Sequence, residues 1–158
     1  MEKITSFTVD HIRMKRGIFV SRKDRFGTTV ITTFDIRMKE PNREPVLDIS
    51  TAHTIEHLGA TFLRNHPEWG NRVVYFGPMG CRTGFYVVLE GDLHSIDVLN
   101  LMRNLFSWIR DYSNSIPGAA PAECGNWQDH NLTMARWEAE RFLQILDTPL
   151  PENLNYPQ

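Results

Sequence analysis

Residues 48–66, DISTAHTIEHLGATFLRNH, form the stretch around which the rest of the chain is organised. The segment is typical of an amphipathic helix and places His53 and His57 four residues apart. At about 100° per residue, the two imidazoles stand about 40° apart on one helix face, so both can reach one ion. Glu56 lies at the edge of that face, where a carboxylate can carry protons beside a metal without binding it. The segment therefore predicts a metal-binding helix; the alternative is a buried histidine pair with a solvated Glu56.

Composition places the chain among ordinary globular proteins. Its 158 residues suit one domain with a sizeable core, and 41% hydrophobic and 23% charged residues are typical of such a domain. A formal net charge of -2 gives no electrostatic reason to bind nucleic acid or an anionic membrane. No apolar run approaches the roughly 18 residues of a membrane span, and the N-terminal sequence lacks the apolar core of a secretion signal. We therefore expect a cytoplasmic protein.

The two cysteines, Cys81 and Cys124, are candidates for chemistry. In a reducing compartment a disulfide is not expected, and a metal-binding or catalytic role is favoured. Cys81 lies in residues 77–84, GPMGCRTG, whose glycines let the backbone approach a ligand closely. Arg82 adds positive charge that favours the thiolate. The alternatives are a plain buried thiol for either cysteine and, for residues 77–84, a tight turn that requires glycines.

Hydrophobic periodicity predicts the strands and helices. Residues 28–38 alternate most clearly, which predicts a strand with Phe34, Ile36 and Met38 in the core. Arg37 then points to the opposite face, toward a polar ligand or an ion pair. Further strands are expected at 4–9, 17–21, 71–76 and 85–90, and further helices at 95–112 and 132–146.

The order of these elements predicts an α+β fold. Strands and helices do not alternate strictly, so we expect an antiparallel β-sheet covered by α-helices in a single domain. This domain is expected to span residues 1–146. Residues 147–158 contain three prolines and no apolar period, which predicts a loose C-terminal tail.

Two histidines and one cysteine would give a metal three protein ligands and an open fourth position. That is the layout of a catalytic metal site, in which the open position can take and polarise a substrate oxygen. From the residues alone, Cys81 and Cys124 compete as the third ligand, and a closed site with both cysteines is a further alternative. A structural site does not need a carboxylate such as Glu56 beside it, which favours the open site.

Residues 53–57, HTIEH, also fit the H-x-x-E-H pattern of inverted zinc peptidases. In that interpretation Glu56 is the general base for a metal-bound water. The peptidase interpretation leaves Cys81, Cys124 and Arg37 without a role. It also requires a chain of only 158 residues to form a peptide-binding cleft. A small metallopeptidase is the alternative enzymatic function. A non-catalytic module stabilised by a metal is the alternative from another class, and it predicts that metal removal unfolds the chain.

Five motifs in register resemble one known family. They occur in this order and at this spacing: SFTVDH (6–11), TFDIRMKEPN (33–42), HTIEHL (53–58), GPMGCRTGFY (77–86) and ECGNWQDHNL (123–132). Together they closely resemble the S-ribosylhomocysteine lyase (LuxS) family over about residues 6–146. Each motif alone is weak, but five in register are highly specific.

The resemblance implies a homodimeric α+β lyase with Fe(II), replaceable by Zn or Co, in each of two active sites at the subunit interface. It implies that His53, His57 and Cys124 bind the metal. It also implies that Cys81 and Glu56 are the two acid/base groups.

The resemblance further implies that Ser6, His11 and Arg37 contact the ribose and neighbouring groups of the substrate. Arg64 is a weaker candidate for the homocysteine carboxylate. Tyr75 stands where many relatives have an aspartate that helps to hold the substrate amine, so the amine contact stays unassigned.

The implied reaction cleaves S-ribosylhomocysteine to homocysteine and 4,5-dihydroxy-2,3-pentanedione, the precursor of autoinducer-two. The sugar opens to an aldose, the carbonyl migrates from C1 to C3 through enediolates, and β-elimination expels homocysteine. Moving protons between adjacent carbons suits one thiolate and one carboxylate, with Cys81 for the first transfers and Glu56 for the later ones. A positive neighbour must favour the Cys81 thiolate, and Arg37 is the best candidate.

Overall fold

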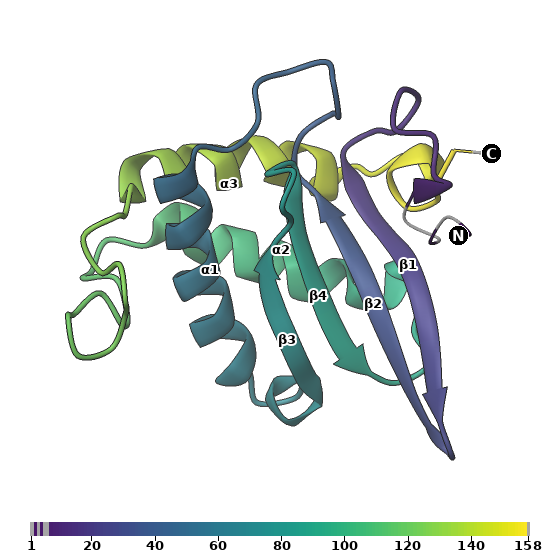
Figure 1. The fold of residues 1–158 in the computed structure, drawn as a ribbon, viewed down its shortest axis with the longest axis horizontal. Helices are drawn as coiled ribbons and strands as arrows, with labels where there is room; N and C mark the ends of the chain where they lie inside the picture. The colour runs from purple at the N-terminus through teal and green to yellow at the C-terminus, as the bar shows by residue number, and fades with distance from the viewer. Residues whose placement is uncertain (1, 3, 5–6, 158) are drawn as a thin grey trace.

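A four-stranded antiparallel sheet and three α-helices make up the part of the computed structural model that is described, residues 2, 4 and 7–157. The strands lie in the order β1-β2-β4-β3 (Figure 1). The elements are β1 (Gly17–Phe26), β2 (Thr29–Arg37), α1 (Ile49–Arg64), η2 (Gly70–Arg72), β3 (Val73–Pro78), β4 (Gly84–Glu90), α2 (Ser95–Asp111), α3 (Leu132–Asp147) and η3 (Pro151–Asn153). The expected α+β class with an antiparallel sheet is thus confirmed.

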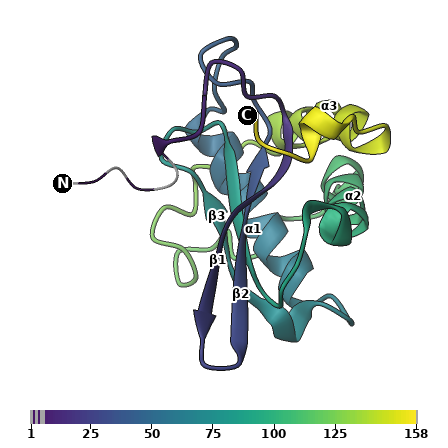
Figure 2. The same cartoon turned by 90° about the vertical axis from the view of Figure 1, so that its right-hand side faces the viewer.

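The helices lie on one face of the sheet and leave the other face to residues 7–16 and 148–157 (Figures 1 and 2). Helix α1 packs beside β3, and α2 and α3 pack on each other. No helix in the described ranges combines the length and the apolar character needed to cross a bilayer.

The alternation of β2 decides which face becomes the core. Phe34 and Ile36 are fully buried and Met38 is 2% exposed, as predicted. Antiparallel pairing sets Phe34 opposite Val87 and Ile36 opposite Phe85, so the apolar sides of β2 and β4 coincide. Burying each such side chain contributes about 1.5–3 kcal/mol.

Helix α1 begins where Asp48 accepts a hydrogen bond from the Thr51 amide at 2.9 Å. Its apolar stripe faces the sheet, with Ile55 and Leu58 fully buried. At Gly59 the helix approaches β3 so closely that a Cβ atom would overlap the Phe76 ring. This close approach fixes which face of α1 turns away from the core.

Two predicted strands differ in the structure. Strand β1 continues to Phe26, past the predicted end at residue 21, because the backbone of residues 22–26 still pairs with β2 although most of these side chains are polar and give no apolar period. Residues 4–9 are not a strand where they are described, since Phe7–Val9 lie in turns. The Asp10 carboxylate accepts hydrogen bonds from the amides of Ile12 and Arg13 just beyond, which favours a turn there.

The C-terminal segment also differs from the expected loose tail. Asn153, in η3, is 9% exposed and donates from Nδ2 to the Arg16 carbonyl at 2.8 Å. The ring of Tyr156 stacks on Phe19 with a centroid separation of 4.8 Å. One amide and one aromatic ring therefore hold the segment on the sheet, and neither contact requires an apolar period.

Replacing Gly59 with alanine should lower the free energy of unfolding by about 1–3 kcal/mol, because the added methyl group must displace the Phe76 ring or α1. This loss is expected although alanine in a helix interior is favoured over glycine by about 1 kcal/mol. Urea denaturation followed by circular dichroism measures it. Gly125→Ala is the control, because a Cβ at Gly125 meets nothing within 4 Å. An undiminished unfolding free energy in Gly59→Ala would contradict the close packing of α1 on β3.

Candidate active site and metal centre

The structure brings His53, His57 and Cys124 together although Cys124 lies far along the chain. One ligand atom from each residue lies within 4.8 Å of the others, and all three side chains are partly buried. The two histidines come from α1, and Cys124 comes from the loop between α2 and α3. Cys81 is not a member of this cluster. The donor set, two imidazoles and one thiolate, suits Zn, Fe or Co.

Backbone carbonyls orient both imidazoles of the cluster. His53 Nδ1 lies 2.9 Å from the Asp129 carbonyl oxygen, and His57 Nδ1 lies 2.7 Å from the Pro117 carbonyl oxygen. A carbonyl can only accept, so each Nδ1 carries the proton and each Nε2 keeps a lone pair for a metal. Cys124 Sγ lies 3.4 Å from His53 Nε2. The residues therefore fit a bound divalent metal.

The loop that supplies these carbonyls needs a glycine beside His57. Gly118 has a φ of 73°, and a Cβ atom there would lie 3.1 Å from His57 Nδ1. At its other end the loop is fastened by Asp129, which accepts hydrogen bonds from the Ser50 hydroxyl and from Asn126 Nδ2. The loop thus holds Cys124 against the start of α1.

His130 is a residue at the metal centre that the sequence did not single out. Its ring stacks on His53 with centroids 4.2 Å apart and meets the edge of His57 at 4.8 Å. His130 Nδ1 lies 3.2 Å from the Thr54 hydroxyl, which itself donates to the Ser50 carbonyl, so Nδ1 is the donor. Burial, with the charges of the two neighbouring histidines, lowers the pKa of His130. The only signal for it was its place in the motif that carries Cys124.

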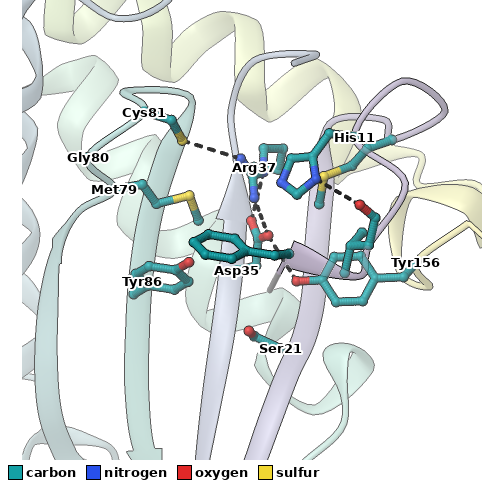
Figure 3. Close-up of a pocket in the computed structure, with 12 residues that line it drawn as sticks. His11, Ser21, Asp35, Arg37, Met79, Gly80, Cys81, Tyr86 and Tyr156 are labelled. Carbon is teal, nitrogen blue, oxygen red and sulfur yellow. Dashed lines mark hydrogen bonds and ion pairs between the residues drawn. The ribbon is translucent and has the colours of Figure 1, made fainter. Parts of the chain in front are cut away.

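Cys81 lies at a separate cavity of about 250 Å³ on the face of the sheet that the helices leave uncovered (Figure 3). The turn between β3 and β4 supplies Cys81, β2 supplies Arg37, and the N-terminal segment supplies His11. The other lining residues are Phe7, Val9, Met14, Ser21, Asp35, Met79, Gly80, Tyr86 and Tyr156.

Arg37 is buried and reaches the Cys81 thiol. Its Nη1 lies 3.7 Å from Cys81 Sγ and also donates to the Thr83 hydroxyl, which lies 3.0 Å from the same sulfur. Burial alone would raise the pKa of Cys81, but hydrogen bonds with Thr83 and the charge of Arg37 outweigh it, so the pKa lies below the usual value. Gly17 and Gly84 are the register partners of Arg37 on β1 and β4. A Cβ atom at Gly17 would overlap the Asn153 carbonyl, and one at Gly84 would overlap the Ile36 carbonyl, so the backbone packs closely on both sides of Arg37.

The remaining sequence-predicted residues have distinct surroundings. Ser6 lies outside the described residues. Arg64 donates to the carbonyls of Val73 and Val74 on β3, at 3.3 and 3.1 Å. Tyr75 is 48% exposed.

The metal cluster and the thiol occupy different places within one chain. None of the residues that line the Cys81 cavity belongs to α1 or to the loop that carries Cys124. Glu56 is half-buried on α1 beside the two histidines. The chain therefore holds two groups of candidate site residues: the possible metal ligands with Glu56, and the Cys81 pocket with Arg37 and His11.

Known proteins resemble this chain over almost its whole length. The family model described as S-Ribosylhomocysteinase (LuxS) matches residues 4–150. A protein from Porphyromonas gingivalis named S-ribosylhomocysteine lyase is 60% identical over 158 residues, covering 99% of each chain. Proteins of the same name from Clostridium acetobutylicum and Borreliella burgdorferi are each 54% identical and cover at least 99% of both chains. With matches of this extent, the chain belongs to the S-ribosylhomocysteinase (LuxS) family.

Proposed function

We propose that this chain, as a metal-dependent S-ribosylhomocysteine lyase, releases homocysteine and 4,5-dihydroxy-2,3-pentanedione, with Cys81 and Glu56 as its proton carriers. The observation that carries the proposal is that the part of the chain matched by the family model, residues 4–150, contains both the group His53, His57 and Cys124 and a thiol beside a buried guanidinium. Nothing in these comparisons or in the described geometry favours the metallopeptidase alternative.

His53, His57 and Cys124 would hold the metal, which we assign as Fe(II), with Zn or Co as substitutes. The orientation of both imidazoles supports this, since their carbonyl partners leave both Nε2 atoms free to bind. When bound, such an ion supplies Lewis acidity to a substrate oxygen.

Cys81 and Glu56 divide the proton transfers. The Cys81 thiolate takes a proton from C2 of the open aldose and returns it to C1 while the hydroxyl proton passes from O2 to O1, which moves the carbonyl to C2. The same pair of transfers, from C3 to C2 and from O3 to O2, then moves the carbonyl to C3. With the carbonyl at C3, the proton on C4 becomes acidic. Glu56 removes it, the C5–S bond breaks, and homocysteine leaves as a thiolate that takes up a proton. The enol left at C4 and C5 loses its hydroxyl proton and gains one at C5, which gives 4,5-dihydroxy-2,3-pentanedione. Arg37 keeps Cys81 in the thiolate form that begins this sequence.

The pocket that holds Cys81 would bind the ribose. His11 and Arg37 line it and offer polar atoms to hydroxyl groups. Ser6 is assigned to the same contact by the family resemblance alone. The amine of homocysteine is left unassigned, because Tyr75 replaces the aspartate of many relatives.

A homodimer with active sites at the interface would join the two groups of residues. The Cys81 cavity contains no residue of the metal cluster, although the proposed reaction needs both on one substrate. A second copy of the chain brings its His53, His57 and Cys124 to the Cys81 cavity of the first, in a closed two-fold pair, which is the commonest assembly of identical chains. Both thiols must also stay reduced, which fits a cytoplasmic enzyme that recycles homocysteine and makes the autoinducer precursor.

Anaerobic protein loaded with Fe(II) or Co(II) should release homocysteine from S-ribosylhomocysteine, measured with a thiol reagent. Cys81→Ala and Glu56→Gln should each lower kcat by about 100-fold or more while the metal content is unchanged, because each removes one proton carrier. No release by the fully metallated parent would contradict the lyase assignment.

Chelation of the metal should stop homocysteine release and leave the far-ultraviolet circular dichroism largely unchanged. Unfolding on chelation would favour the metal-stabilised module.

Mixing the two inactive variants tests the dimer. If Cys81 and Glu56 of one site come from different subunits, a mixed dimer holds one intact site and one doubly altered site. Statistical exchange should therefore restore about a quarter of the parent activity. Each variant mixed with itself is the control. A mixture that stays inactive after subunit exchange, verified by native mass spectrometry, would show that each chain builds its own site.

The pH dependence of Cys81 alkylation tests the thiolate. Its midpoint should lie below the value of about 8.5 for a free thiol, and Arg37→Met should raise it by about one unit, because a positive charge beside the sulfur favours the thiolate. Iodoacetamide labelling at each pH, quantified on the Cys81 peptide by mass spectrometry, gives the midpoint. Arg82→Met removes the same charge from an exposed neighbour and should shift it much less. Equal shifts in both variants would exclude a specific role for Arg37.

A further inference from the structure

We propose that Tyr156, in the C-terminal segment, is a positioning residue that acts through Asp35 on Arg37 and thereby on Cys81. This inference rests on the proposed role of Cys81 as a proton carrier. Tyr156 lies beyond residues 4–150, the part of the chain that the family model matches, and yet its side chain lines the Cys81 cavity.

An uninterrupted series of polar contacts joins the tyrosine to the thiol (Figure 3). The Tyr156 hydroxyl donates to Asp35 Oδ2 at 2.9 Å. Arg37 donates to both oxygens of Asp35, from Nε at 3.0 Å and from Nη2 at 2.5 Å. The remaining Nη1 of Arg37 faces Thr83 and lies 3.7 Å from Cys81 Sγ. The two hydrogen bonds to Asp35 therefore set the orientation of the guanidinium at the sulfur.

The register of the sheet explains why Tyr156 reaches Asp35. Phe19 on β1, Asp35 on β2 and Tyr86 on β4 are paired in one row across the sheet. The Tyr156 ring stacks on Phe19 at an interplanar angle of 10°, so its hydroxyl extends to the next residue of the row, which is Asp35. Asn153 anchors the preceding turn on the Arg16 carbonyl.

The Tyr156 hydroxyl helps to compensate the buried charge of Asp35. Asp35 is 2% exposed and Arg37 is 3% exposed, so both charges have lost their water and need protein partners. Burial raises the pKa of Asp35, and Arg37 and the Tyr156 hydrogen bond oppose that shift. Burial likewise raises the pKa of Tyr156, which keeps the hydroxyl protonated as a donor. Without this donor, the carboxylate charge is less compensated and the ion pair less fixed, and both changes disfavour the thiolate at Cys81.

Tyr156→Phe isolates the hydroxyl, because phenylalanine keeps the stack on Phe19. Cys81 alkylation by iodoacetamide is measured against pH on the metal-loaded protein, without substrate, and the midpoint should rise by about half a unit. Tyr112→Phe is the matched control: its hydroxyl also donates one hydrogen bond, at 2.7 Å to the Ser115 carbonyl, outside the cavity. The titratable groups that line the cavity with Cys81 are His11, Asp35, Arg37, Tyr86 and Tyr156.

A double-mutant cycle decides whether the effect passes through Arg37. In an Arg37→Met background, Tyr156→Phe should no longer move the midpoint, because the connecting side chain is gone. An unchanged midpoint in Tyr156→Phe, or a shift that persists undiminished in the Arg37→Met background, would overturn the proposal. The labelling needs no turnover, so its outcome is independent of whether the lyase assay succeeds.

Discussion

The buried ion pair between Asp35 and Arg37 constrains the uncovered face of the sheet. The two residues stand two positions apart on β2, on the side opposite the apolar core, where a strand would ordinarily meet water. Two charges that have lost their water are tolerated only when other polar groups satisfy them. The segments with His11 and Tyr156 cover the pair from solvent, and Tyr156 also donates a hydrogen bond to Asp35. The cavity at Cys81 is the space left between these segments and the strands.

At the proposed metal centre too, side chains on a regular element are oriented by partners on an irregular segment. Helix α1 fixes the spacing of His53 and His57, but a helix alone does not choose the ring rotations. Carbonyl groups from an irregular loop do so, and that loop also brings Cys124. Irregular backbone suits this task because its carbonyls are not consumed by a helix or a sheet ladder. Regular structure therefore sets the position of the proposed ligands, and the loop sets their direction.

The strands and helices with a regular hydrophobic periodicity could be predicted from the sequence. The segments held in place by single contacts could not. Phe34, Ile36 and Met38 followed from alternation, and helix α1 followed from its apolar stripe. The packed C-terminal segment depends on the Asn153 hydrogen bond to Arg16 and on the Tyr156 contacts with Phe19 and Asp35, and none of these contacts requires an apolar period. His130 was missed for a similar reason, since its contact with His53 joins α1 to a loop through ring stacking. Ser6, outside the described residues, stays a prediction.

The separation of Cys81 from the metal cluster within one chain has a chemical consequence. A thiolate is a strong ligand for Zn or Fe, so a sulfur free to approach the open position would bind there and lose its basicity. Thr83 and Arg37 hold the Cys81 sulfur at the β3–β4 turn, away from His53 and His57 of the same chain, and Arg37 gives it a positive partner that is not a metal. Because Asp35 fixes the guanidinium through two hydrogen bonds, the sulfur in the β3–β4 turn has a partner that is itself held on β2. The ion pair that the sheet buries at a cost is thus what allows the proposed base and the proposed metal to act on one substrate without binding each other.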